Sequence, residues 1–279
     1  MKQETLSLLF PQWQGSSIAD PRGLLDGAKK LRALFSERDF TELEVDPKRT
    51  SAEIAGIFSH AVLKQQLAAC HLIEEVRPER LLTLGGDCSV DLAPVSYLNE
   101  RYDDLAVLWL DAHADLNTPG TSPSGALHGM VLRLLLGEGE PELLTRVQKP
   151  LEPRQVFLAG VRSFDLSERA YADAATIRRF GVSELERWPD HVTEALKSRG
   201  FGRLHLHLDL DVLDPDTFAA TGYPTPGGLS LSGATKLLSA LETSFEVVGI
   251  TVTEYLPQAG GETRERAVLQ ALIGSLPKL

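Results

Sequence analysis

Two acidic clusters are the residues of this sequence best suited to chemistry. Asp111, His113 and Asp115 lie in the segment DAHAD, and Asp209 and Asp211 lie in the segment DLDVLDP. Each cluster follows an apolar run that predicts a buried strand, so each places carboxylates where a strand ends. Converging carboxylates repel one another unless a cation lies among them, and a set rich in carboxylates favours hard divalent ions such as Mn²⁺. We therefore expect a metal site, and hydrolysis by a metal-activated water as its chemistry.

The spacing within the clusters supports one shared site but leaves simpler alternatives open. Alternate residues of an extended segment share a face, so Asp111, His113 and Asp115 can point the same way. A helix-capping aspartate together with a hydrogen-bonded histidine would explain Asp115 or His113 singly, although not all three residues. His205 and His207 lie further inside the second strand, and we expect them to form hydrogen bonds in the core rather than to bind a metal.

Three other polar segments follow expected strands. Cys88 follows a Gly-Gly turn at a strand–helix junction, and its position alone favours an inert buried thiol. A polar loop over residues 117–125 leads to His128, whose pKa near neutrality suits proton transfer, although a histidine at a helix start is the alternative. Glu254 ends the last expected strand, where a lone glutamate is usually a surface residue or an ion-pair partner.

Apolar runs alternate with helical patterns along most of the chain, which predicts a parallel sheet flanked by helices. The carboxyl ends of the strands form the functional crevice of such a sheet, so the polar clusters should meet there. No linker or repeat divides the sequence, and we expect one α/β/α domain over residues 1–279. The expected strands span residues 6–10, 42–45, 80–84, 105–110, 155–160, 176–180, 204–208 and 247–253. The expected helices span residues 20–38, 50–76, 89–98, 126–136, 167–175, 183–199, 231–241 and 263–276, the second beginning with a capping-box pattern at residues 50–53.

Charge and composition narrow the classes of function. The chain has 279 residues, a formal net charge of −11 and only two cysteines. The negative charge disfavours nucleic acid and anionic membranes as partners. We expect a cytoplasmic protein, because two cysteines are too few for a disulfide framework and the sequence shows neither a membrane-length apolar run nor a secretory leader.

Together, the polar segments resemble the ureohydrolase superfamily of arginases, agmatinases and formiminoglutamases. Three motifs carry the resemblance in order: GGDC at 85–88, DAHAD at 111–115 and DLDVLDP at 209–215. It implies an arginase-like three-layer α/β/α fold with a mostly parallel central sheet, and a homo-oligomer, either a trimer or a hexamer. It also implies two Mn²⁺ ions and hydrolysis of a C–N bond in a linear amidine.

The resemblance also implies which residues bind the two ions and which act in catalysis. The implied metal ligands are Cys88, Asp111, His113, Asp115, Asp209 and Asp211. Asp111 and Asp209 would bridge the ions, Cys88 and Asp115 would complete the first ion's shell, and the other two ligands would complete the second. Asp115 would also accept a hydrogen bond from the activated water. His128 would assist departure of the amine, and Glu254 would pair with the guanidinium group.

The loop before His128 favours an amino-acid substrate. Asn117, Ser122 and Ser124 match positions at which arginases hold the α-carboxylate of the substrate. Asp165, supported by Glu168, matches the contact to the α-amino group. The resemblance therefore implies a small cationic guanidino amino acid as partner, cleaved to urea or a substituted urea and an amino acid such as ornithine.

Three departures from the family pattern bear on the metal and on the substrate. Cys88 stands where most members have histidine, and its softer thiolate would make the first ion weak, exchangeable or of another identity. Ala126 replaces a substrate-binding asparagine, and Tyr223 places a bulky phenol near the expected pocket. These two changes favour an arginine derivative, for example Nω-hydroxyarginine. Agmatine, guanidinobutyrate, formiminoglutamate or a non-catalytic protein that binds metal and amino acid remain the alternatives.

Overall fold

The computed structural model describes residues 4–46 and 60–279 and contains one eight-stranded sheet with the order β2-β1-β3-β8-β7-β4-β5-β6. All pairs of neighbouring strands are parallel, which confirms the expected α/β class. The strands are β1 (Thr5–Phe10), β2 (Thr41–Glu42), β3 (Arg80–Gly85), β4 (Leu105–Leu110), β5 (Val156–Ala159), β6 (Arg178–Phe180), β7 (Arg203–Asp209) and β8 (Glu246–Thr253).

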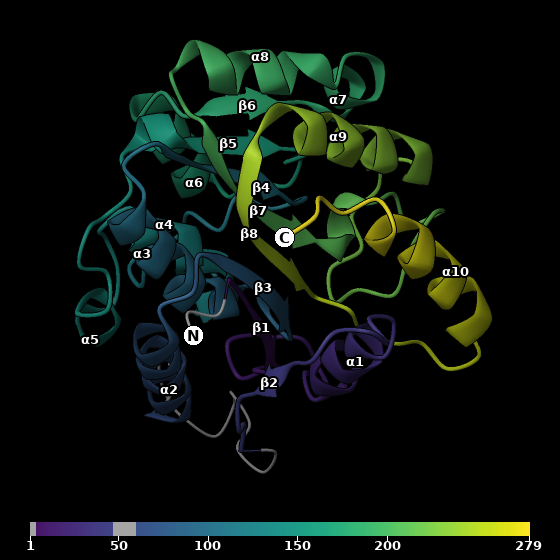
Figure 1. Ribbon diagram of the computed structural model, residues 1–279, viewed down its shortest axis with the longest axis horizontal. Helices are drawn as coiled ribbons and strands as arrows, with labels where there is room; N and C mark the ends of the chain where they lie inside the picture. The colour runs from purple at the N-terminus through teal and green to yellow at the C-terminus, as the bar shows by residue number, and fades with distance from the viewer. Residues whose placement is uncertain (1–3, 47–59) are drawn as a thin grey trace.

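Helices cover both faces of the sheet and form a three-layer arrangement (Figure 1). One face is covered by α2 (His60–Val76), α3 (Leu92–Arg101), α4 (Val131–Leu135), α5 (Pro141–Leu144) and α6 (Leu166–Ala174). The other is covered by α1 (Gly23–Arg32), α7 (Val182–Arg187), α8 (Asp190–Ser198), α9 (Leu231–Ser244) and α10 (Glu262–Ile273). Within the described ranges, no helix is long and apolar enough to cross a membrane.

Alternation along the strands divides the apolar side chains between the two faces. Trp109 packs in the core beneath α2–α6, whereas its neighbours Leu108 and Leu110 pack in the core beneath α1 and α7–α10. All of these side chains are fully buried, so β4 reads as a continuous apolar run in the sequence.

Each expected strand has a counterpart in the sheet, but several helices differ from expectation for local reasons. The prediction of a single helix over 183–199 is wrong, because α7 ends at Arg187 and a separate helix, α8, follows it. Pro189 disfavours helical geometry in the residue before it, which explains the break. The helices predicted to begin at 89 and 126 begin instead as the short 3₁₀ helices η2 (Cys88–Asp91) and η3 (Leu127–Met130). Helix α5 was not expected, and β2 has only two residues. The predicted capping box at residues 50–53 lies outside the described residues.

The four central strands bring the polar segments to one edge of the sheet. Their order is β3-β8-β7-β4, and their carboxyl ends lie side by side because the strands are parallel. Cys88 follows β3, Asp111 follows β4, Asp209 ends β7 and Glu254 follows β8. The expectation that these clusters meet is therefore confirmed.

Candidate active site

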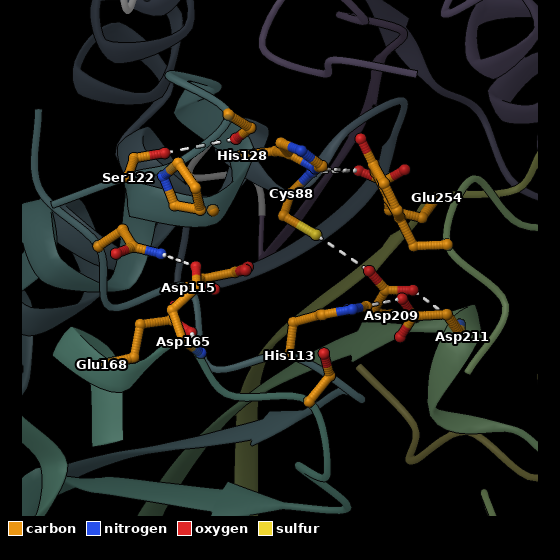
Figure 2. Close-up of a pocket in the computed structure, with 16 residues that line it drawn as sticks. Cys88, His113, Asp115, Ser122, His128, Asp165, Glu168, Asp209, Asp211 and Glu254 are labelled. Atoms are coloured by element: carbon orange, nitrogen blue, oxygen red, sulfur yellow. Dashed lines mark hydrogen bonds and ion pairs between the residues drawn. The ribbon is translucent and has the colours of Figure 1, made fainter. Parts of the chain in front are cut away.

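A cavity of about 200 Å³ opens at this edge of the sheet (Figure 2). It is lined by the side chains predicted for the site, with the exception of Asp111, which is fully buried beside it. The predicted residues that line the cavity are Cys88, His113, Asp115, Asn117, Ser122, Ser124, His128, Asp165, Glu168, Asp209, Asp211, Tyr223 and Glu254.

Two groups of side chains in the described residues could each hold a metal ion. The first comprises Cys88, Asp111, His207 and Asp209, and the second comprises Asp111, His113 and Asp211. Within each group the donor atoms lie within 4.8 Å of one another, and Asp111 belongs to both. These donors and distances fit a pair of divalent cations. Asp115, expected in the shell of the first ion, lies outside both groups and lines the cavity instead.

Short hydrogen bonds fix the carboxylates of these two groups. The backbone N–H of His113 donates to Asp111 Oδ1 at 2.6 Å, and Trp109 Nε1 donates to Asp111 Oδ2 at 3.1 Å. The backbone N–H of Asp211 donates to Asp209 Oδ1 at 2.7 Å, and Cys88 Sγ donates to Asp209 Oδ2 at 3.1 Å. The two acidic clusters are thus held by the backbone turns that carry them and by the side chains of Trp109 and Cys88.

The buried carboxyl groups of the site repel one another, which favours the binding of a cation. Burial, and then the charge of neighbouring aspartates, raises the pKa of Asp111, Asp115 and Asp209, the last two well above the usual range. Burial opposes protonation of His113, but its contacts with Asp111 and Asp211 raise its pKa to about 12. Nδ1 of His113 lies 2.9 Å from Asp211 Oδ2. Divalent ions placed among these acids would relieve the repulsion that raises their pKa values.

Strained backbone places two further carboxylates in the cavity. Asp115 and Glu254 have φ values of 51° and 63°, in the left-handed region that non-glycine residues seldom adopt. Both side chains are buried, and Asp115 Oδ2 and Glu254 Oε2 accept no hydrogen bond from residues 4–46 or 60–279. Each carboxylate therefore has an oxygen available to a bound molecule or ion.

His128 is paired with Glu254 across the cavity. Its Nδ1 lies 3.2 Å from Glu254 Oε1, which also accepts the backbone N–H of Cys88 at 3.3 Å. Burial lowers the pKa of His128, but the hydrogen bond and charge of Glu254 prevail and raise it above its usual value. The ring of Tyr223 lies beside that of His128, with centroids 5.5 Å apart. Tyr223 is 38% exposed and therefore stands at the mouth of the cavity.

The polar loop and the start of α6 form the opposite wall. Asp165 and Glu168 form a capping box at the start of α6, and both Glu168 oxygens accept backbone N–H groups, from Leu116 and Asp165. Asn117 Nδ2 donates to Asp165 Oδ2 at 2.8 Å, which ties the loop to the helix. Glu168 therefore positions Asp165 and the loop.

The serines of this loop also support its backbone. Ser122 Oγ accepts the backbone N–H of Gly125 at 3.0 Å, and Ser124 Oγ accepts that of Ala126 at 3.2 Å. Both side chains line the cavity. Their hydroxyl groups are thus held in place where a bound molecule could meet them.

Sequence reasoning did not find Asp91 beneath the site, and it did not expect His207 among the candidate metal donors. His205 and His207 do form hydrogen bonds in the core, as expected, and their partner is the buried Asp91 of η2. His207 also belongs to the first candidate metal group, which was not expected. The two-residue period shared by His207 and Asp209 was the available signal for His207, whereas Asp91 carried none beyond its position after the GGDC motif.

Comparisons of the sequence and of the structure with known proteins all find similarity to arginases. The sequence matches the model of the arginase family over residues 21–275. An arginase of Staphylococcus aureus (strain COL) is 37% identical over 201 residues, which cover 70% of the chain and 66%, a little under two thirds, of that relative. An arginase of Schizosaccharomyces pombe is 30% identical over 240 residues, covering 80% of the chain and 74% of the relative. The solved structure of arginase from Bacillus caldovelox superposes with a TM-score of 0.84 at 28% identity, covering 99% of the chain and 98% of that structure.

Proposed function

Because the chain belongs to the arginase family, we propose that it is a metal-dependent amidinohydrolase acting on arginine or an arginine derivative. The products would be urea, or a substituted urea, and an amine-bearing amino acid such as ornithine. The observation that carries this proposal is the pair of candidate metal groups that share Asp111 at the edge of one cavity.

Two divalent cations are the cofactor that this donor set supports. Asp111, His113 and Asp211 offer oxygen and one nitrogen, a set that suits Mn²⁺. The first group would hold manganese less well because it includes the thiol of Cys88. When bound, such a pair supplies a nucleophile at neutral pH by lowering the pKa of water.

The remaining carboxylates and His128 would bind and activate the guanidinium group. Glu254 Oε2 is buried without a partner in the described chain, and a planar guanidinium donates well to a carboxylate. His128 holds Glu254 through Nδ1, which leaves Nε2 to deliver a proton to the departing amine nitrogen. Asp115 Oδ2 would accept a hydrogen bond from the attacking water.

The opposite wall would hold the amino-acid end of the substrate. Asn117, Ser122 and Ser124 would bind the α-carboxylate, and Asp165 would bind the α-amino group. Tyr223 narrows the mouth beside His128 and would contact the substrate side chain. This arrangement supports an amino acid over agmatine, which lacks the carboxylate.

A substrate panel tests the proposal. The purified protein, loaded with Mn²⁺ or with Co²⁺, is incubated with arginine, Nω-hydroxyarginine, agmatine, guanidinobutyrate and formiminoglutamate, and the products are identified by mass spectrometry. We expect turnover of arginine or hydroxyarginine to exceed that of the others, and Asp209→Ala to lose metal and activity together. No turnover of any compound would refute the proposal, and retained binding of metal and amino acid would then indicate a non-catalytic member of the family.

We also propose that the whole chain is one domain, that it assembles as a trimer or hexamer and that it resides in the cytoplasm. The assembly and the domain organisation rest on the family, and sedimentation velocity of the purified protein tests the assembly. A monomer over the micromolar range would contradict it.

A further inference from the structure

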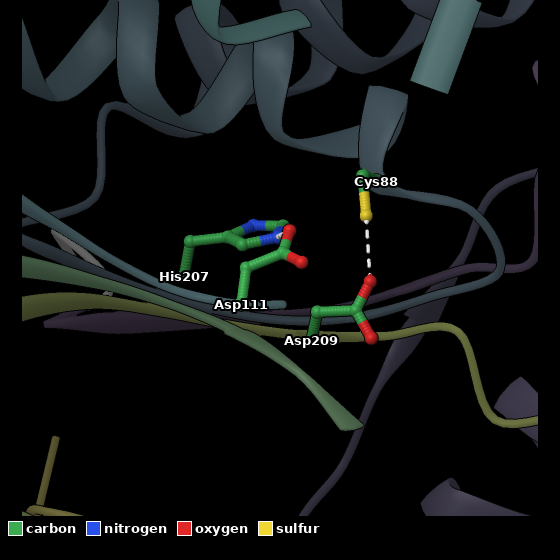
Figure 3. Close-up of side chains that lie close together, drawn as sticks. All are labelled: Cys88, Asp111, His207 and Asp209. Atoms are coloured by element: carbon green, nitrogen blue, oxygen red, sulfur yellow. Dashed lines mark hydrogen bonds and ion pairs between the residues drawn. The ribbon is translucent and has the colours of Figure 1, made fainter. Parts of the chain in front are cut away.

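One ring nitrogen of His207 is hydrogen-bonded, but the other is buried near a carboxylate without a hydrogen-bond partner in the described chain. Its Nδ1 lies 2.8 Å from Asp91 Oδ2, and its ring stacks on Trp109 with centroids 3.5 Å apart and planes 4° apart. Its Nε2 is buried without a hydrogen-bond partner among the described residues and lies 3.8 Å from Asp111 Oδ2 (Figure 3). That separation is too long for a hydrogen bond.

We propose that His207 is a ligand of the first metal ion and supplies the imidazole that this group lacks at Cys88. The inference rests on the proposed function only in that both require metal at this edge of the sheet. When the N–H at Nδ1 donates a hydrogen bond to Asp91, Nε2 carries a lone pair that points toward the carboxylate of Asp111. Two hydrogen-bond acceptors, His207 Nε2 and Asp111 Oδ2, then face each other. A cation between them removes this conflict. Two ligand atoms that each lie about 2 Å from one ion are about 3–4 Å apart, which the 3.8 Å separation matches.

Asp91 is the positioning residue for this ligand. Metal-binding histidines commonly donate their second ring nitrogen to a carboxylate, which fixes the tautomer and the direction of the free nitrogen. Asp91 Oδ1 accepts a hydrogen bond from Thr251 Oγ1 at 2.6 Å, so its own orientation is set by β8. Contacts with both imidazoles hold the pKa of Asp91 below its usual range in spite of its burial.

His205 provides a natural comparison within the same strand. Its Nε2 lies 2.9 Å from the same oxygen of Asp91, and it is as completely buried as His207. Its Nδ1 also has no partner in the described chain, but this atom faces Gly249 and is absent from both candidate metal groups. Orientation toward ligand carboxylates therefore distinguishes His207.

The resulting donor set differs in chemical character from the second group. A thiol, an imidazole and two carboxylates favour ions softer than Mn²⁺, such as Zn²⁺ or Co²⁺. The second group has one imidazole and two carboxylates, and it suits a harder ion. The two groups therefore differ in the kind of metal ion that they favour.

Cobalt titration of the whole chain tests the ligand directly. Only the first group contains Cys88, so the thiolate-to-Co²⁺ absorption band reports that ion alone. His207→Asn keeps an amide N–H for Asp91 and removes the free nitrogen, whereas His205→Gln is the matched change at the control position. We expect the band to require roughly 100-fold more Co²⁺ in His207→Asn and to titrate as in the wild type in His205→Gln. Wild-type affinity in His207→Asn, or no band in the wild type, would overturn the proposal.

Two further measurements test the proposal without the His207→Asn variant, in case that variant does not fold. In the wild-type protein with ¹⁵N-labelled histidine and bound ¹¹³Cd, we expect cadmium coupling to nitrogens of both His113 and His207, and coupling to His113 alone would overturn the inference. Asp91→Asn should raise the Co²⁺ concentration needed to form the band by about 10–100-fold. None of these readouts uses turnover. A protein that binds the first ion through His207 yet hydrolyses nothing would refute the proposed function alone.

Discussion

Replacing Arg162 by lysine should loosen the segment that carries Asp211. The half-buried guanidinium of Arg162 donates to backbone carbonyls on three segments, including those of Asp211 at 2.8 Å and Thr225 at 2.6 Å. The full set of carbonyl acceptors is Gly160, Asp211, Val212, Leu213, Thr225 and Pro226. One side chain thus holds the end of β5, the turn after β7 and the loop that leads to α9.

The expected magnitude follows from the geometry of the two side chains. The lysine ammonium has three donors at one point, so it cannot span the six carbonyls that the guanidinium fork reaches. At least three hydrogen bonds would be lost, each with a net value of about 1 kcal/mol. We expect Arg162→Lys to lower the free energy of unfolding by about 3 kcal/mol. The melting temperature would fall by about 2–4 °C for each kcal/mol.

Urea denaturation in the presence of a chelator measures this change without a contribution from bound metal. Manganese affinity, measured separately, should fall about tenfold because Asp211 loses its support. Arg154→Lys is the matched control, since Arg154 is 61% exposed and pairs with Glu152 on the surface, and its effect should lie within about 0.5 kcal/mol. Destabilisation by Arg162→Lys of less than about 1 kcal/mol, with unchanged manganese affinity, would refute this reasoning.

Three other changes have defined outcomes. His128→Ala should retain both ions by metal analysis and lower kcat about 10²–10⁴-fold, so full activity would exclude the proton-transfer role. Tyr223→Thr should widen the mouth of the cavity and raise kcat/KM for arginine relative to Nω-hydroxyarginine, and an unchanged ratio would remove Tyr223 from substrate selection. Burial, and then the charge of Glu74, raises the pKa of Cys70 to about 11. Its alkylation by iodoacetamide, followed by peptide mapping, should therefore accelerate about tenfold per pH unit above pH 8, and a plateau near pH 9 would contradict the shift.

The sheet and the position of the site were predictable because both depend on short-range patterns. The apolar run over β4 and the alternation before Asp209 determine strands, and parallel strands bring their carboxyl ends together. The break between α7 and α8 could also have been predicted, since Pro189 disfavours helix in the preceding residue.

Features that depend on distant residues were not accessible in this way. The contact of His207 with Asp91 joins positions 116 residues apart, and nothing local to either residue indicates it. The left-handed backbone of Glu254, which turns its carboxylate into the cavity, likewise depends on the tertiary structure around β8. The metal pair was therefore predicted from its carboxylates, whereas the imidazole proposed for the first ion emerged only from the packing beneath it.

Hydrolysis in ¹⁸O-labelled water is the most direct test of the central claim. The metal-loaded protein is given arginine, or whichever guanidino acid of the panel it cleaves, and the products are analysed by mass spectrometry. Attack of water on the guanidinium carbon predicts one ¹⁸O atom in the urea and none in the amino acid. Absence of urea, or label in the amino-acid product instead, would contradict the account.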